Sequence, residues 1–228
     1  MMDEQKNKKK NTENGAKGVM GNVILIFFVS VLVVLGVSIV VRLDEQNKVR
    51  KAIATGQVEK PEIKQMLLTP NKYSRSGKKM TSIKGIVIHY TANPGSTAVQ
   101  NRNYFENLRK KKTTYASSHY VIGLKGEIVQ CVPLNEIAYA SNKRNKDTIS
   151  IECCHPGKEG KFTTQTYDSL VKLVSWLCGK YNLKQDDIIR HYDVTGKMCP
   201  KYYVKNKDLW KKFKKDVFIY ISKNASTE

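Results

Sequence analysis

Gly85-Ile86-Val87-Ile88-His89-Tyr90 is a short apolar run that ends in a histidine and a tyrosine. A run of this length, bounded by turn residues, is typical of a strand that is buried on both faces. The turn residues Asn93-Pro94-Gly95-Ser96 follow, and Ser96 or Thr97 can cap a helix that we expect to extend to about Lys111. A buried strand that leads through a turn into a helix is the repeating unit of an α/β sheet.

The same alternation of strand and helix patterns continues toward the C-terminus. Lys125-Gly126 separates two apolar runs, which predicts a hairpin. We therefore expect an α/β fold, a single domain with a central mixed β-sheet flanked by helices, preceded by one N-terminal transmembrane helix. The remaining expected elements are the hairpin strands Tyr120–Leu124 and Glu127–Val132, the strands Thr148–Cys153 and Ile188–His191, and the amphipathic helices Thr164–Tyr181 and Asp208–Ile221.

The longest apolar run lies near the N-terminus, where residues 18–41 carry no charged side chain. As a helix this run reaches about 36 Å, enough to cross a hydrocarbon core of roughly 30 Å. A buried core helix rarely continues so far without a polar face, and a cleaved signal peptide has a shorter apolar core and a cleavage site. We therefore favour an uncleaved signal anchor. The expected organisation is a cytoplasmic tail 1–17, a transmembrane signal anchor 18–41, a juxtamembrane stalk 42–61 and a main domain 62–228.

The composition is strongly basic. The 228 residues contain 40 Lys and Arg against 20 Asp and Glu, a formal net charge of +20. This balance excludes an acidic disordered chain, and the single long apolar run excludes a polytopic membrane protein. The excess of positive charge indicates polyanionic neighbours, such as nucleic acid or, for a domain outside the membrane, anionic wall polymers. An alternative interpretation is that the runs of lysine simply form helix faces exposed to solvent.

Five cysteines are present, and their odd number and irregular spacing do not resemble a disulfide framework. Cys153 and Cys154 are adjacent in an expected strand, so their side chains should lie on opposite faces of the sheet. Together with Cys178, which lies in an apolar helix stripe, we interpret them as small core residues. Cys199 is different because of the histidines that precede it.

Two of the four histidines, His89 and His191, stand where expected strands end. Strand ends lead into loops, where functional sites are usually built. Cys199 follows His191 by eight residues, and Gly196 between them allows the chain to fold back. Two imidazoles and one thiolate suit a four-coordinate Zn²⁺ that keeps one position open. Spacing alone also allows the interpretation that both histidines are ordinary polar core residues.

Five stretches, taken in order, resemble the type-2 family of zinc-dependent N-acetylmuramoyl-L-alanine amidases, which includes phage lysins and autolysins and shares its fold with peptidoglycan recognition proteins. The resemblance extends from about residue 62 to residue 221. The stretches are GIVIHYTANPGSTA (85–98), ASSHYVIG (116–123), GEIVQCVPLNE (126–136), DTISIE (147–152) and RHYDVTGKMCP (190–200).

The resemblance implies a zinc cofactor and a set of site residues. By position, His89, His191 and Cys199 correspond to the zinc ligands, and Lys197 to a cationic residue that stabilises the oxyanion. Glu152 corresponds to a glutamate that faces the water on the metal, so it is expected to be the general base. One departure is Ser118, which stands where some relatives have a catalytic tyrosine.

The implied reaction is hydrolysis, by zinc-activated water, of the amide between the lactyl group of N-acetylmuramic acid and L-alanine of the stem peptide. Because peptidoglycan lies outside the membrane, we expect a single-pass cell-membrane protein with its catalytic domain on the cell-wall side. We expect no nucleic-acid partner, since no such motif is present. The alternatives are a catalytically silent membrane-tethered peptidoglycan-binding protein, and a thiol hydrolase that uses Cys153 or Cys154. Stem-peptide preference, physiological role, regulation, cleavage of the anchor and oligomeric state stay open.

Overall fold

The computed structural model describes residues 27–47, 49–51 and 58–224. The chain divides into two compact units, residues 1–47 and residues 48–228.

The larger unit is organised around one six-stranded sheet with the strand order β1-β4-β3-β5-β2-β6. All neighbouring strands are parallel except β3 and β4, which form the expected antiparallel hairpin. The mixed α/β sheet that we predicted is therefore confirmed. The strands are β1 (Lys64–Gln65), β2 (Gly85–Tyr90), β3 (Tyr120–Ile122), β4 (Ile128–Gln130), β5 (Thr148–Cys153) and β6 (Ile188–Arg190).

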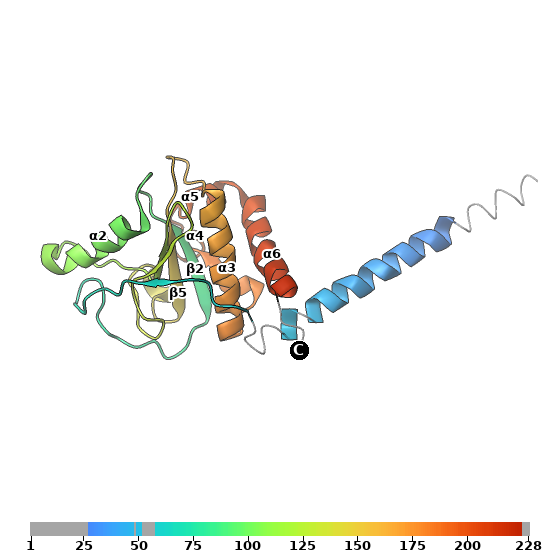
Figure 1. Ribbon diagram of the computed structural model, residues 1–228, viewed down its shortest axis with the longest axis horizontal. Coiled ribbons are helices and arrows are strands. Elements are labelled where there is room, and N and C mark those ends of the chain that lie inside the picture. The colour runs from blue at the N-terminus through green and yellow to red at the C-terminus, as the bar shows by residue number, and fades with distance from the viewer. Residues whose placement is uncertain (1–26, 48, 52–57, 225–228) are drawn as a thin grey trace, which may run out of the picture. The chain divides into compact units, whose positions relative to one another are not determined.

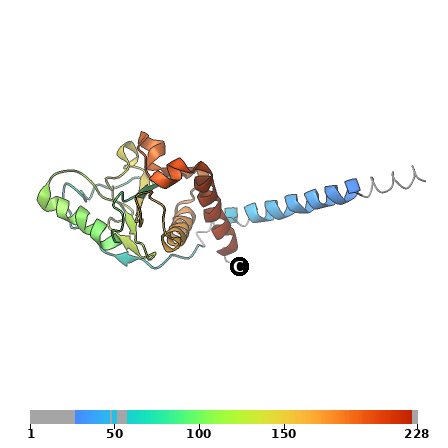
Figure 2. The same cartoon turned by 90° about the horizontal axis from the view of Figure 1, so that it is seen from above.

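Helices cover both faces of this sheet. Figures 1 and 2 show α3 and α6 beside one face and α2 beside the other. Thr97 begins α2 with a capping box, because its side chain and that of Gln100 each accept from the other residue's backbone N–H. The helices are α2 (Ala98–Lys111), α3 (Thr164–Tyr181), α4 (His191–Thr195), α5 (Lys201–Lys205) and α6 (Lys207–Asn224), with two short 3₁₀ turns, η1 (Asn142–Arg144) and η2 (Gln185–Asp187).

Two hydrophobic clusters occupy the two faces of the sheet. Ile88 and Ile151 belong to the cluster that includes the α3 and α6 side chains, whereas Ala98 and Phe105 of α2 belong to the other cluster. Because side chains alternate along a strand, His89 and Glu152 point to the α2 face. The fold therefore places both side chains on the same face, at the carboxyl ends of β2 and β5.

The cysteine predictions agree with this packing. All five cysteines are buried and free. Cys153 packs in the cluster with α3 and α6, and its neighbour Cys154 packs in the cluster with α2. Their placement on opposite faces of the sheet is confirmed.

Some local predictions were wrong. His191 is the first residue of α4 and not the last residue of a strand, because Asp193 accepts from the Arg190 backbone N–H and side chain and so begins a helix there. The sequence patterns also gave no signal for β1, α4 or α5.

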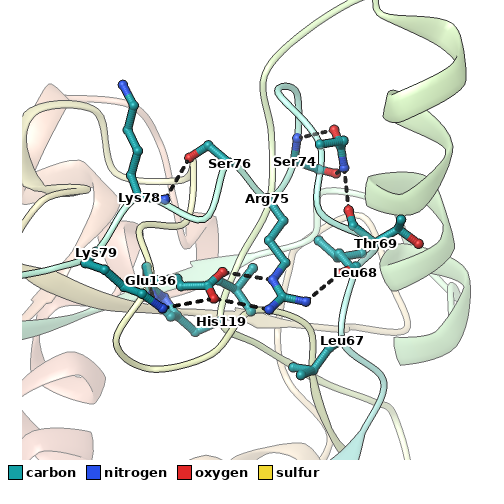
Figure 3. Close-up of polar contacts among 12 residues, drawn as sticks. Leu67, Leu68, Thr69, Ser74, Arg75, Ser76, Lys78, Lys79, His119 and Glu136 are labelled. Carbon is teal, nitrogen blue, oxygen red and sulfur yellow. Dashed lines mark hydrogen bonds and ion pairs between the residues drawn. The ribbon is translucent and has the colours of Figure 1, made fainter.

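An ion pair ties the segment before β2 to the loop after β4 (Figure 3). Arg75 donates to both carboxylate oxygens of Glu136, at 2.8 and 3.1 Å, and to the backbone oxygen of Leu68 at 2.8 Å. Lys79 adds a longer contact of 3.4 Å to the same carboxylate. The backbone oxygen of Glu136 also accepts from the buried imidazole of His119 at 2.9 Å. This network joins the segment before β2, the loop after β4 and the residue that precedes β3.

The N-terminal unit consists largely of a helix, Phe27–Lys51, whose last residues belong to the larger unit; the helix has 25 residues and a mean hydropathy of 2.3 over its most apolar window. Its length and composition suit a membrane crossing, and they suit a signal sequence as well. Residues 18–26 of the expected anchor lie outside the described residues. The helix continues beyond residue 41 into the expected stalk.

Candidate active site

Three potential metal ligands converge at the carboxyl end of the sheet. His89 ends the apolar part of β2, and His191 begins α4 directly after β6, the strand that pairs with β2. Gly196 ends α4 in the left-handed conformation, with φ 78°, and the Tyr192 N–H donates to the Cys199 oxygen at 2.9 Å. This turn returns the Cys199 thiol to the two imidazoles.

The donor atoms of His89, His191 and Cys199 all lie within 4.8 Å of one another, and all three residues are buried. Cys199 Sγ is 3.8 Å from His89 Nδ1, and the two imidazole centroids are 4.7 Å apart. The structure thus brings together the three side chains that the spacing and the resemblance singled out.

The electrostatics of this group suit a divalent metal. Burial lowers the pKa of His89 well below its usual value, and burial lowers that of His191 too, so both imidazoles are neutral and can act as ligands. Burial raises the pKa of Cys199 to about 12, so a metal that binds here must displace the thiol proton. Two neutral imidazoles and one thiol fit zinc with an open fourth position.

Glu152 lies beside this group. It is the register partner of His89 on the adjacent strand, and its Oε1 is 3.9 Å from His89 Nδ1. Its Oε2 is buried and has no hydrogen-bond partner among the described residues. Burial raises the pKa of Glu152 to about 8, although Lys197 opposes the shift. An unpartnered buried carboxylate is costly, so this oxygen is suited to a water, a substrate or a metal.

Lys197 is exposed and stands between His191 and Cys199 on the loop that follows α4. Its positive charge lowers the pKa of Glu152 and of both site histidines. Its ammonium group is therefore close enough to act on negative charge in the cleft.

These residues line one cleft of about 380 Å³. Aromatic rings and amide side chains also line this cleft. Thr91 contributes a buried hydroxyl oxygen without a partner among the described residues. The lining residues outside the five quoted stretches include Phe105, Tyr115, Tyr139, Asn142 and Asn145, and sequence reasoning missed them.

The other candidate groups lie elsewhere. His119 is buried between the Ser150 hydroxyl, 3.0 Å from Nδ1, and the Glu136 backbone oxygen. Ser118 is buried and donates to the backbone oxygen of Tyr120. Burial raises the pKa of Cys154 to about 12 and that of Cys153 well above its usual value, which does not favour either thiol as a nucleophile.

Comparisons with known proteins identify relatives of this chain. The family model described as N-acetylmuramoyl-L-alanine amidase matches residues 79–202. The N-acetylmuramoyl-L-alanine amidase CwlL of Bacillus licheniformis is 36% identical over 162 residues, covering 64% of this chain and 44% of that protein. The amidase BlyA of Bacillus subtilis (strain 168) is 38% identical over 168 residues, with the same two coverages. The chain thus spans 44% of the length of these curated relatives.

Solved structures show the same fold. The structure of PlyL aligns with a TM-score of 0.60 at 25% identity and covers 69% of this chain and 97% of its own. The catalytic domain of XlyA aligns with a TM-score of 0.59 at 27% identity and covers 69% of this chain and 99% of its own.

Proposed function

The chain belongs to the N-acetylmuramoyl-L-alanine amidase family, and from this we propose that it hydrolyses the amide between the lactyl group of N-acetylmuramic acid and L-alanine of the stem peptide in peptidoglycan. One observation supports this proposal most. The potential metal ligands His89, His191 and Cys199 line the same cleft as Glu152. A binding protein without activity has no need for an unpartnered buried carboxylate beside three metal-ligand side chains.

His89, His191 and Cys199 would hold the zinc ion. When bound, zinc supplies a Lewis acid that polarises a carbonyl and lowers the pKa of water. Its positive charge also favours the ionised form of a neighbouring carboxyl, which suits Glu152 as a base. The pKa of Glu152 in the fold is about 8, close to neutrality, so a small lowering of this pKa is enough to ionise the carboxyl group.

The chain's own residues perform the proton transfers. Glu152 accepts a proton from the attacking water as the new carbon–oxygen bond forms. Lys197 lies beside the cleft, where its ammonium group stabilises the negative charge that develops on the carbonyl oxygen. Glu152 then gives the proton to the nitrogen of L-alanine as the carbon–nitrogen bond breaks. The stem peptide leaves with a free amino terminus, and the lactyl group keeps a carboxylate.

We test the reaction with purified peptidoglycan and mass spectrometry of released stem peptides. The full chain should release peptides with new L-alanine amino termini, and both a chelator and Cys199→Ala should abolish the release. Cys178→Ala is the matched control, because Cys178 is also a buried free cysteine but packs in the core cluster. Binding to peptidoglycan without cleavage, even with zinc supplied, would instead indicate a recognition protein.

For the location, we propose that the helix Phe27–Lys51 anchors the protein in the cell membrane with the catalytic unit on the wall side. Deletion of residues 1–47, the separate N-terminal unit, should move the protein from the membrane fraction to the soluble fraction. The deletion should also widen the set of glycan strands that are cut, because the tether restricts the reach. An unchanged cleavage pattern would contradict the tethering.

The net charge of +20 further favours contact with anionic wall polymers. Binding of the catalytic unit to cell walls should weaken as salt is raised, and removal of teichoic acids from the walls should have the same effect. Binding that is insensitive to both would exclude this partner.

A further inference from the structure

One short segment contacts both histidines of the site. Residues 140–145, here called the η1 turn, contain the 3₁₀ helix η1. The Ser141 hydroxyl oxygen is 3.1 Å from His89 Nε2, and the Asn142 side-chain oxygen is 3.4 Å from His191 Nε2. Two consecutive residues of the η1 turn thus contact the two site histidines, one each, and both contacts are made to Nε2.

These contacts decide which nitrogen each ring offers. An amide oxygen only accepts, so Asn142 requires a proton on His191 Nε2, and a neutral His191 then carries its lone pair on Nδ1. For His89, Nε2 is engaged by Ser141, and Nδ1 is the nitrogen that lies 3.8 Å from Cys199 Sγ. In both rings Nδ1 is therefore the nitrogen left available as a metal ligand.

We propose that the η1 turn is a positioning device for the metal, in which Ser141 and Asn142 orient the two imidazoles and fix the tautomers that can ligate. The identification of the metal as zinc rests on the proposed function. Groups that hydrogen-bond the outer nitrogen of a ligating histidine set its ring orientation and strengthen it as a ligand. Ser141 and Asn142 thereby act through His89 and His191 and do not touch the metal.

The η1 turn is itself firmly held. The Asn145 side-chain oxygen accepts from the backbone N–H groups of Ala140 and Ser141, at 3.0 and 2.5 Å. The Thr148 hydroxyl, at the start of β5, donates to the Arg144 oxygen at 2.6 Å. Asn142 has φ 50°, a left-handed conformation that Asn tolerates better than most residues. The turn is thus fixed to the strand that carries Glu152, before any metal binds.

The test measures the affinity for zinc of the full chain in detergent, by competition with a chromophoric chelator. Asn142→Gly permits the same left-handed backbone and removes the amide side chain, and Ser141→Ala removes only the hydroxyl. Each change should raise the Kd for zinc about tenfold, and the two together about 100-fold. Ser141→Thr and Asn142→Asp retain an oxygen at the same place, so neither should weaken zinc binding; the added negative charge of Asn142→Asp can only strengthen it.

Two control variants carry the same chemical changes far from the site. Asn182→Gly alters the left-handed C-cap of α3, with φ 52°, and Ser175→Ala removes a buried hydroxyl that donates to the Val217 oxygen at 3.1 Å. Both should leave the Kd for zinc unchanged. If the controls weaken zinc binding as much as the site variants do, the effect is one of general stability and the positioning role is wrong.

An unchanged Kd for zinc in the Ser141→Ala, Asn142→Gly double variant would overturn the proposal, as would a wild-type chain that does not bind zinc. A wild-type chain that binds zinc, loses affinity in these variants and yet releases no stem peptide would support the positioning role and contradict the amidase function. The two proposals can therefore fail separately.

Discussion

His89 on β2 and Glu152 on β5 are register partners in parallel strands, and His89 Nδ1 lies 3.9 Å from Glu152 Oε1. They are 63 residues apart in the sequence, and only the pairing of the two strands brings them together. Because both strands are buried in the sheet, their register is strongly specified, and the backbone sets the position of the proposed ligand His89 relative to the proposed base Glu152.

Glu152→Gln keeps the shape of the side chain and removes its ability to exchange a proton. Loss of a general base should lower kcat by about 10²–10⁴-fold. The Kd for zinc should change little, since Glu152 is not among the ligands, and stopped amidase assays with a zinc titration check both values. Glu159→Gln, at a carboxylate that is 72% exposed, is the control. Equal losses in both variants would exclude Glu152 as the base.

Lys197→Met removes the positive charge near the cleft without disturbing the core, since the side chain is exposed. We expect kcat to fall by about 100- to 1000-fold, as for the loss of an oxyanion donor, while the melting temperature stays unchanged. Lys197→Arg should keep more of the activity than Lys197→Met. Lys125→Met, at an exposed lysine in the β3–β4 turn, is the control and should change neither kcat nor the melting temperature. A fall in melting temperature that accompanies the lost activity would instead indicate a structural role.

Arg75 and Lys79 both contact the carboxylate of Glu136, so their contributions to stability can be compared directly. Arg75→Met removes a bidentate partner from a carboxylate that is 8% exposed, and it should lower the free energy of unfolding by about 2–3 kcal/mol. Lys79→Met removes a partner that is 63% exposed and should cost less than about 1 kcal/mol. Urea unfolding of both variants checks the difference. Similar costs would show that the Arg75 contact adds nothing beyond a surface ion pair.

His119 should make the fold sensitive to acid. Burial lowers its pKa to about 4, against about 6.5 in the unfolded chain, so between these values the unfolded state binds more protons. The stabilising effect of a neutral His119 is therefore fully present above pH 6.5 and is lost as the pH falls toward 4, by roughly 3 kcal/mol in all.

Urea unfolding of the wild type and of His119→Gln, with chelator present throughout, isolates this contribution. The difference in stability between the two proteins should shrink as the pH is lowered. The ring protons of His119, followed by NMR in the wild type, supply a second measurement that does not depend on the variant. A ring that titrates above pH 6 would contradict the assignment.

Local pattern was sufficient for much of the fold. The bounds of β2, β5 and α3 agree with the expected ranges, because an apolar run between turn signals and a continuous helical stripe are properties of neighbouring residues. β1 is only 2 residues long, and no periodicity can mark so short a strand. The sequence patterns did not predict α4, because the start of this helix depends on contacts between the Arg190 and Asp193 side chains.

The sequence by itself determined which residue types were available for the chemistry: a histidine near the end of one apolar run, a second histidine directly after another, a cysteine after a glycine turn, and a glutamate at the end of an apolar run. It could not place the η1 turn, since Ser141 and Asn142 belong to no motif. Only the tertiary structure decided that these two residues contact the histidines, that Glu152 faces His89, and that Oε2 of Glu152 is buried without a partner among the described residues. The reason is physical: identity and periodicity are local, whereas strand register and loop docking depend on burial between segments far apart in the chain.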